Sequence, residues 1–142
     1  MSDEPTTPDL VERTRKFFER AERREFDPDM ALWSPDAVWD SSALGLGVTE
    51  GAATIRSVNE EWFGNYEEYE NQLVEVQDLG NGVVFVVNQL DARPAGSTRR
   101  VRERLTFTLV WSADVITRVT MAKDIEEARA AAERLAQERA GG

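Results

Sequence analysis

The amino-acid sequence predicts an α+β fold, a single domain with helices packed on one face of a curved antiparallel sheet. Three observations predict this class. The chain has 142 residues, which is the usual size of one domain. Helical periodicity dominates its N-terminal half, and strand-like runs bounded by turn signals follow from about residue 73 to residue 121. Because the strands follow one another instead of alternating with helices, they are expected to form a meander and not a parallel sheet.

The N-terminal half is predicted to contain three helices. In the first, Thr7 is expected to be the N-cap and Pro8 the first helical residue. Its core-facing residues recur at helical spacing: Leu10, Thr14, Phe17, Phe18 and Ala21. A second start signal at residues 27–29 predicts a short helix that includes Trp33 and ends before Pro35, and a short strand over residues 37–39 follows.

The third predicted helix runs from about Glu50 to Phe63. Thr49 is its expected N-cap, and Gly64-Asn65 is a typical helix end. The loop-like residues 43–47 precede it. Its inward side is expected to contain Ile55, Val58, Asn59, Trp62 and Phe63.

The C-terminal half is predicted to form four antiparallel strands and a closing helix. The strand-like runs are Leu73–Val76, Val83–Leu90, Val101–Trp111 and Val115–Met121. The first connection contains Asn81-Gly82, a strong hairpin signal, and residues 92–98 and 112–114 form the other two turns. Residues from Ile125 to Ala140 are rich in Ala, Glu and Arg and are expected to be helical.

Residues 1–8 are predicted to be a flexible N-terminus and residues 9–140 the domain. The first nine residues lack the basic start and apolar run of a signal peptide. No uncharged stretch approaches the roughly 20 apolar residues of a membrane-spanning helix. We therefore expect a cytoplasmic protein.

The composition excludes several kinds of chemistry. The chain contains no His and no Cys, so zinc-finger sites, thiolate nucleophiles and histidine bases are excluded. Seventeen Lys and Arg against 27 Asp and Glu give a net charge of −10, which repels nucleic acids and anionic membranes. We expect no cofactor, no metal, no nucleic-acid partner and no membrane partner.

The charges are distributed unevenly along the chain. Residues Glu50–Glu75 contain seven Glu and one Arg, whereas Asp91–Arg104 contains five Arg, one Asp and one Glu. Two interpretations are open. Either the two segments are solvated faces of opposite sign, or they meet across a dimer contact.

The chain resembles the nuclear transport factor 2-like superfamily, in its SnoaL-like branch, over about Leu10 to Leu135. The resemblance depends on features that occur in the order of that family: the segment 31–40, Gly51 before Ile55-Arg56, the hairpin 80–82, Arg104, Ile116-Thr117-Arg118, Asp124 and Glu127-Ala128. It implies a cone of curved sheet closed by three helices around an apolar cavity, often in a homodimer formed through the outer sheet face. The residues expected to line the cavity are Phe17, Trp33, Val58, Trp62, Tyr66, Phe85 and Phe107.

The resemblance also allows a test for ketosteroid isomerase chemistry, which needs a carboxylate base, a Tyr and a protonated Asp. Aligned with that family, the chain has Phe17 in place of the Tyr and Ser41 in place of the base, with Asp40 one residue early. The protonated Asp corresponds to about Thr106. Successive strand residues face opposite sides, so Asp40 is expected to point away from the cavity. Ketosteroid isomerisation is therefore disfavoured.

The superfamily also contains two other carboxylate arrangements. The Asp-Arg-Asp arrangement of its epoxide hydrolases has a superficial counterpart in Glu103, Arg104 and Asp124, but adjacent strand residues cannot both face a cavity without a bulge. Cyclases of the SnoaL-like kind need one carboxylate, which Asp40 or Asp124 can supply. The structural alternatives are a turn carboxylate for Asp40 and a helix N-cap for Asp124.

The sequence therefore leaves function hypotheses of different classes. The first is a domain that binds a small apolar or amphipathic molecule in the cavity. The second is a cyclase, isomerase or dehydratase with Asp40 or Asp124 as base and Tyr66, Tyr69 or Asn88 as hydrogen-bond donor. A third is an interaction domain that uses the outer sheet face, on which Arg104 is expected by alternation, either in a dimer interface or paired with an acid.

Overall fold

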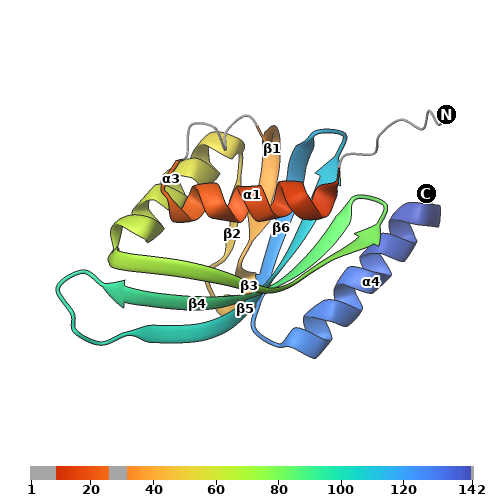
Figure 1. Ribbon diagram of the computed structural model, residues 1–142. Coiled ribbons are helices and arrows are strands. Elements are labelled where there is room, and N and C mark those ends of the chain that lie inside the picture. The colour runs from red at the N-terminus through yellow and green to blue at the C-terminus, as the bar shows by residue number, and fades with distance from the viewer. Residues whose placement is uncertain (1–8, 26–31, 142) are drawn as a thin grey trace.

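A computed structural model of the protein describes residues 9–25 and 32–141 (Figure 1). Within them, one curved sheet has the strand order β2-β1-β6-β5-β4-β3. The elements are α1 (Leu10–Glu22), β1 (Trp33–Asp40), the 3₁₀ helix η1 (Ser42–Leu44), β2 (Val48–Glu50), α3 (Ala52–Gly64), β3 (Tyr66–Gly80), β4 (Val83–Pro94), β5 (Val101–Ser112), β6 (Val115–Ala122) and α4 (Ile125–Gly141). The α+β class and the curved sheet are confirmed.

The sheet is mixed and larger than the predicted meander. Strands β3, β4, β5 and β6 are consecutive antiparallel neighbours, as expected. Strand β1 pairs in parallel with β6, and β2 adds an antiparallel edge. A strand as short as Val48–Glu50 has no pattern of its own in the sequence, and it includes Thr49, the predicted helix cap. Helix α3 begins instead after Gly51, whose φ of 94° favours glycine.

The N-terminal start signals differ from the prediction. Asp9 is the N-cap of α1, and its carboxylate accepts hydrogen bonds from the backbone N–H groups of Val11 and Glu12. Thr7 and Pro8, the predicted cap and first helical residue, lie outside the described residues, as does the signal at 27–29. Trp33, predicted in the second helix, lies in β1. The β1–β6 register shifts between Trp33 and Val38. Pro35, which has no N–H to donate to a neighbouring strand, is tolerated at this irregularity.

Helices cover both faces of the sheet. Figure 1 shows α1 and α3 over one face, here called the inner face, and α4 packed on the opposite, outer face. On β5, Leu105, Phe107, Leu109 and Trp111 belong to the inner core, as the alternation predicts. The outer core lies between α4 and the sheet and consists of Val83, Phe85, Val87, Ala132 and Ala136.

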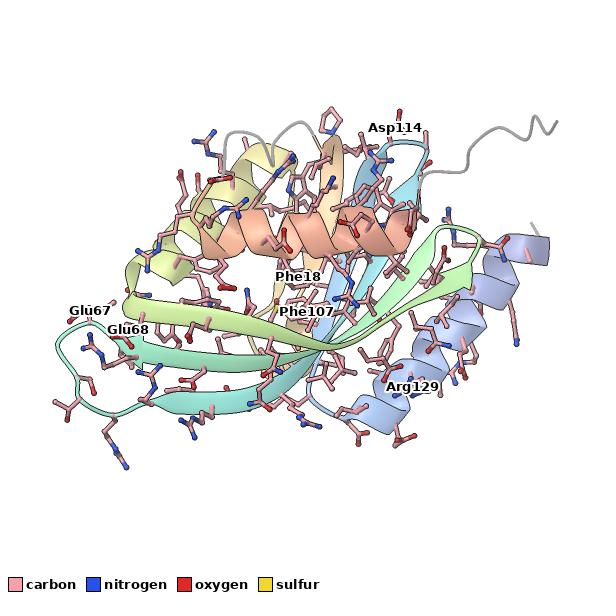
Figure 2. The ribbon with its side chains drawn as sticks, viewed as in Figure 1. Phe18, Glu67, Glu68, Phe107, Asp114 and Arg129 are labelled. Atoms are coloured by element: carbon pink, nitrogen blue, oxygen red, sulfur yellow. The ribbon has the colours of Figure 1, made fainter. Side chains whose placement is uncertain are left out.

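The acidic and basic segments meet within one chain, an arrangement that neither interpretation of the charge pattern included. Arg93 pairs with Glu67 at 3.1 Å, and Arg100 pairs with Glu68 at 2.6 Å and with Asp91 at 2.8 Å. This follows from the topology, because β4 lies between acidic β3 and basic β5. Figure 2 shows Glu67 and Glu68 at the end of the sheet far from α4.

Within the described residues, no helix is long and apolar enough to span a membrane.

Candidate functional site

A cavity of about 120 Å³ lies between the inner sheet face and helices α1 and α3. Its size is close to that of an engineered apolar cavity of about 150 Å³ that binds benzene. It is lined by Phe17, Phe18, Ala21, Trp39, Ser41, Leu46, Thr49, Val58, Asn59, Trp62, Phe63, Tyr69, Asn71, Phe107 and Met121. Seven of these side chains are aromatic, and none is a carboxylate or a cation.

Each element supplies lining residues at its own period. Helix α1 presents Phe17, Phe18 and Ala21, which share one helical face. Strand β1 presents Trp39, and Ser41 directly after the strand faces the same side because every second residue does so. Figure 2 shows Phe18 and Phe107 between α1 and the sheet, and their rings meet edge to face with centres 5.0 Å apart. Helix and sheet are therefore held apart by large side chains.

The polar groups of the cavity gather mainly where α3 faces β3. The indole Nε1 of Trp62 donates a hydrogen bond of 3.3 Å to the hydroxyl oxygen of Tyr69. Burial raises the pKa of Tyr69 to about 12, so the hydroxyl stays protonated at neutral pH. The side-chain oxygen of Asn71 accepts a 2.8 Å hydrogen bond from Asn88. Glu22 accepts the backbone N–H of Asn71 and thereby joins the end of α1 to this strand.

Ser41, the residue at the position of the ketosteroid isomerase base, has its own hydrogen bonds. The Nε1 of Trp39 donates to Ser41 Oγ at 3.0 Å and lies 3.1 Å from the sulfur of Met121. The hydroxyl of Ser41 in turn lies 3.4 Å from that sulfur. A neutral hydroxyl in this arrangement orients Trp39, and its hydrogen-bond partners among the described residues include no base that could activate it.

The cavity opens between the loop after η1 and helix α3. Leu46 and Val58 line the cavity although 62% and 49% of their surfaces are exposed. Val48, nearby in the chain on β2, is 54% exposed. Large exposed apolar residues around an opening are typical of a ligand entrance.

Asp40 does not face the cavity. Its neighbours Trp39 and Ser41 do, so its carboxylate points to the outer side, where Arg118 approaches it at 2.9 Å. Hydrogen bonds from the hydroxyl and backbone N–H of Ser42, together with Arg118, hold the pKa of Asp40 below its ordinary value. A lowered pKa and an outward direction both disagree with a general base acting in the cavity.

Asp124 also lies away from the cavity, as the N-cap of α4. Asp124 is exposed, and its carboxylate accepts a hydrogen bond of 3.0 Å from the backbone N–H of Glu127. Glu103 pairs with Lys123 at 3.0 Å, while exposed Arg104 donates to Gln89 at 3.0 Å. The three groups of the hydrolase-like arrangement therefore do not converge on the cavity.

The predicted cavity residues divide into three groups. Phe17, Val58, Trp62 and Phe107 line the cavity, as expected. Trp33 and Tyr66 lie behind the lining: Trp33 packs on Trp39 with ring centres 5.8 Å apart, and Tyr66 packs on Trp62 at 5.5 Å. The assignment of Phe85 is wrong. This residue points to the outer face and packs under α4, where the guanidinium of Arg129 lies 5.0 Å from its ring centre.

The structure also shows where the predicted hydrogen-bond donors Tyr69 and Asn88 lie, and where Thr106 lies. Tyr69 lines the cavity, whereas Asn88 is buried behind it with 1% exposure. Its Oδ1 has no hydrogen-bond partner among the described residues. Thr106, aligned with the protonated Asp, points to the outer side and donates to the carbonyl of Ala122 at 3.2 Å.

Several lining residues were missed by the sequence reasoning. The helical period already placed Phe18 and Ala21 beside Phe17, and strand alternation placed Trp39 beside Ser41, so these could have been found. Asn71 could not, because the acidic start of β3 hides the strand pattern there. Among the described residues, no group of three or more carboxylates is arranged to hold a metal ion.

Comparisons with known proteins agree on one fold. The SnoaL-like domain family matches residues 14–119. A putative SnoaL-like polyketide cyclase from Shewanella putrefaciens CN-32 superposes with a TM-score of 0.70 at 11% identity, covering 92% of this chain and 98% of that chain. An LEH-like epoxide hydrolase from M. tuberculosis gives a TM-score of 0.72 at 14% identity, covering 87% and 84%.

A third solved structure carries a bound small molecule. It is a hypothetical protein with a ketosteroid isomerase-like fold from Catenulispora acidiphila DSM 44928, in complex with trimethylamine. It gives a TM-score of 0.68 at 14% identity and covers 82% of this chain and 85% of that chain. No curated protein matches the sequence. At these identities the solved structures show the fold alone.

Proposed function

Because the chain belongs to the SnoaL-like domain family, we propose that it binds a small apolar or amphipathic molecule in the cavity under α1 and α3. One observation carries the proposal: seven aromatic side chains surround a space of about 120 Å³ that opens to the surface between Leu46 and Val58. Apolar pockets with a few polar groups are the usual form of a small-molecule site.

The size of the cavity limits the size of the proposed ligand. A space close to the benzene-binding cavity of about 150 Å³ accepts one ring, and any larger part of a ligand extends through the opening. The related fold with bound trimethylamine is consistent with a small occupant. A ligand that covers the aromatic walls removes them from contact with water. This burial contributes roughly 25 cal/mol to the binding free energy per Å² of apolar surface buried.

A filled-cavity variant tests the proposal. In Ala21→Phe the new ring occupies the space, so toluene is expected to bind at least about tenfold more weakly than to the wild type. The measurement is an NMR titration that follows the indole N–H signals of Trp39 and Trp62, which line the cavity. Ala53→Phe, the same change at an exposed position of α3, is the matched control and is expected to bind toluene normally.

Two results decide the matter. Equal toluene affinity in Ala21→Phe and Ala53→Phe contradicts binding in this cavity. A natural occupant is sought by mass spectrometry of the protein recovered from a cell extract, where a molecule released by the wild type and absent from Ala21→Phe supports the proposal.

A carboxylate-dependent enzyme, the second interpretation of the sequence, has no observation in its favour at this cavity, since neither Asp40 nor Asp124 lines it. A homodimer through the outer face and a cytoplasmic location stay predictions. Helix α4 covers the part of that face around Phe85, while the strand ends near Gln89 and Arg104 stay uncovered by it. Sedimentation of the purified protein measures the oligomeric state.

A further inference from the structure

Hydrogen bonds around the cavity engage three side-chain oxygens as acceptors and leave two donor groups free. The oxygen of Tyr69 already accepts from Trp62, the side-chain oxygen of Asn71 accepts from Asn88, and Ser41 Oγ accepts from Trp39. A phenol has one hydrogen to donate and Asn71 has a side-chain NH₂ group. Within the described part of the chain, neither the Tyr69 hydroxyl hydrogen nor the Asn71 NH₂ group has an acceptor in the hydrogen bonds found.

The lining also determines the charge that a ligand can carry. No Asp, Glu, Lys or Arg side chain lines the cavity, so a charged group brought there has no partner of opposite sign. Moving an unpaired charge into an apolar site is far more costly than moving a neutral polar group that gains a hydrogen bond. The cavity therefore favours an uncharged molecule.

From this geometry we infer that the ligand is an uncharged single-ring molecule with one hydrogen-bond acceptor oxygen, such as a carbonyl, which accepts the hydrogen of the Tyr69 hydroxyl. The inference rests on the proposed function, because it names the class of ligand for the same cavity. The hydrogen bond from Trp62 fixes the position of the Tyr69 oxygen. It therefore helps to determine the direction in which the free hydroxyl hydrogen of Tyr69 points. Asn71, two residues further along β3, is the second donor beside it.

The protonation of Tyr69 agrees with this role. Its pKa of about 12 keeps the hydrogen in place through the neutral range. The phenol therefore donates to an acceptor and does not remove a proton from the ligand. Its place in the site is that of a positioning and specificity residue.

A matched pair of probes tests the inference. Cyclohexanone and methylenecyclohexane have the same shape and differ in the acceptor oxygen. Tyr69→Phe is expected to weaken cyclohexanone binding about fivefold, the loss of one net hydrogen bond, and to change methylenecyclohexane binding by less than about twofold. Tyr66→Phe is the control, because Tyr66 packs on Trp62 without lining the cavity, and it is expected to alter neither affinity. Both affinities come from the Trp39 and Trp62 indole signals.

A second measurement uses the wild-type protein alone. The infrared C=O stretch of bound cyclohexanone is expected at lower frequency than the stretch of cyclohexanone dissolved in a hydrocarbon, because a hydrogen bond weakens the carbonyl bond. A hydrocarbon-like frequency overturns the inference even where Tyr69→Phe fails to fold.

The outcomes separate the two proposals. If both probes bind and Tyr69→Phe weakens them equally or not at all, the inference is overturned and the proposed function stands. If toluene and both probes fail to bind the wild-type protein, the proposed function is overturned and the inference with it. If toluene binds and cyclohexanone does not, the inference alone is overturned. A loss confined to cyclohexanone supports both.

Discussion

The two faces of the sheet are both apolar, but they are covered in different ways. Under α4, the small residues Ala132 and Ala136 let the helix approach Val83, Phe85 and Val87 closely. Under α1 and α3, large rings such as Phe18 and Phe107 stand between helix and sheet and leave a space of about 120 Å³. Aromatic content alone therefore does not make a cavity. What matters is whether the covering helix presents small or large side chains to the sheet.

The difference between the faces also appears in their polar contacts. On the outer face, Arg129 of α4 pairs with Glu75 and lies over Phe85, and Arg139 donates to the carbonyl of Asn81 at 2.8 Å. These contacts cross from helix to sheet, as the position of Arg129 in Figure 2 illustrates. On the inner face the polar groups Tyr69 and Asn71 turn toward the space instead. The outer face is therefore closed by contacts between helix and sheet, whereas the inner face keeps polar groups beside an open space.

The largest expected effect compares one Phe from each face. Phe85→Ala is expected to reduce the free energy of unfolding by about 4 kcal/mol, because a fully packed ring leaves a new void. Phe107→Ala is expected to cost about 1 kcal/mol less, because part of its ring already faces empty space. Urea denaturation of both variants measures the difference. A smaller loss for Phe85→Ala than for Phe107→Ala contradicts the comparison.

A smaller effect, of opposite sign on the two faces, is expected when alanines are enlarged. Ala132→Leu forces a larger side chain between α4 and the sheet and is expected to destabilise by about 1–3 kcal/mol. Ala21→Leu fills cavity space and is expected to leave stability unchanged or raise it by roughly 1 kcal/mol. Thermal unfolding of the two matched variants is the measurement. Destabilisation of similar size in both shows that the inner face is as tightly packed as the outer one.

The error on Phe85 shows what strand alternation can and cannot predict. On β5 the alternation of apolar and polar residues assigned Leu105 and Phe107 to the inner face correctly. On β4 the run Val83–Val87 is apolar at every position, because both faces of that strand are covered. Such a run contains no information on which residues face which side. Only the position of α4, a long-range contact, decides it.

The same distinction holds for the rest of the fold and the site. The hairpin at Asn81-Gly82, the C-terminal end of α3 and the start of α4 are local signals, and they were predictable. Strand β2 and the parallel pairing of β1 with β6 depend on contacts between distant segments and left no pattern in the sequence. For the site, the one-residue offset of Asp40 from Ser41 was enough to predict that the carboxylate faces outward, which the structure confirms.

The smallest expected effect tests that outward placement. The folded pKa of Asp40 lies below its ordinary value of 3.8, so its contribution to stability is fully present above that pH and is lost as pH falls through the lower, folded pKa. Asp40→Asn is expected to lower stability at pH 7 by less than about 1 kcal/mol, as for other partly exposed ion pairs. It should also flatten the acid limb of the stability curve. Urea denaturation between pH 7 and about pH 3 measures both, with the wild type alongside.

Ligand affinity gives that variant its second measurement. Since Asp40 and its partner Arg118 lie on the outer side of β1 and β6, Asp40→Asn is expected to bind toluene and cyclohexanone with unchanged affinity at pH 7. Asp124→Asn is the parallel case at the start of α4, where an asparagine also caps a helix well. A fall in probe affinity in Asp40→Asn but not in Asp124→Asn means that the Asp40 carboxylate reaches the cavity, and the division between a packing face and a face proposed to bind ligand then fails at β1.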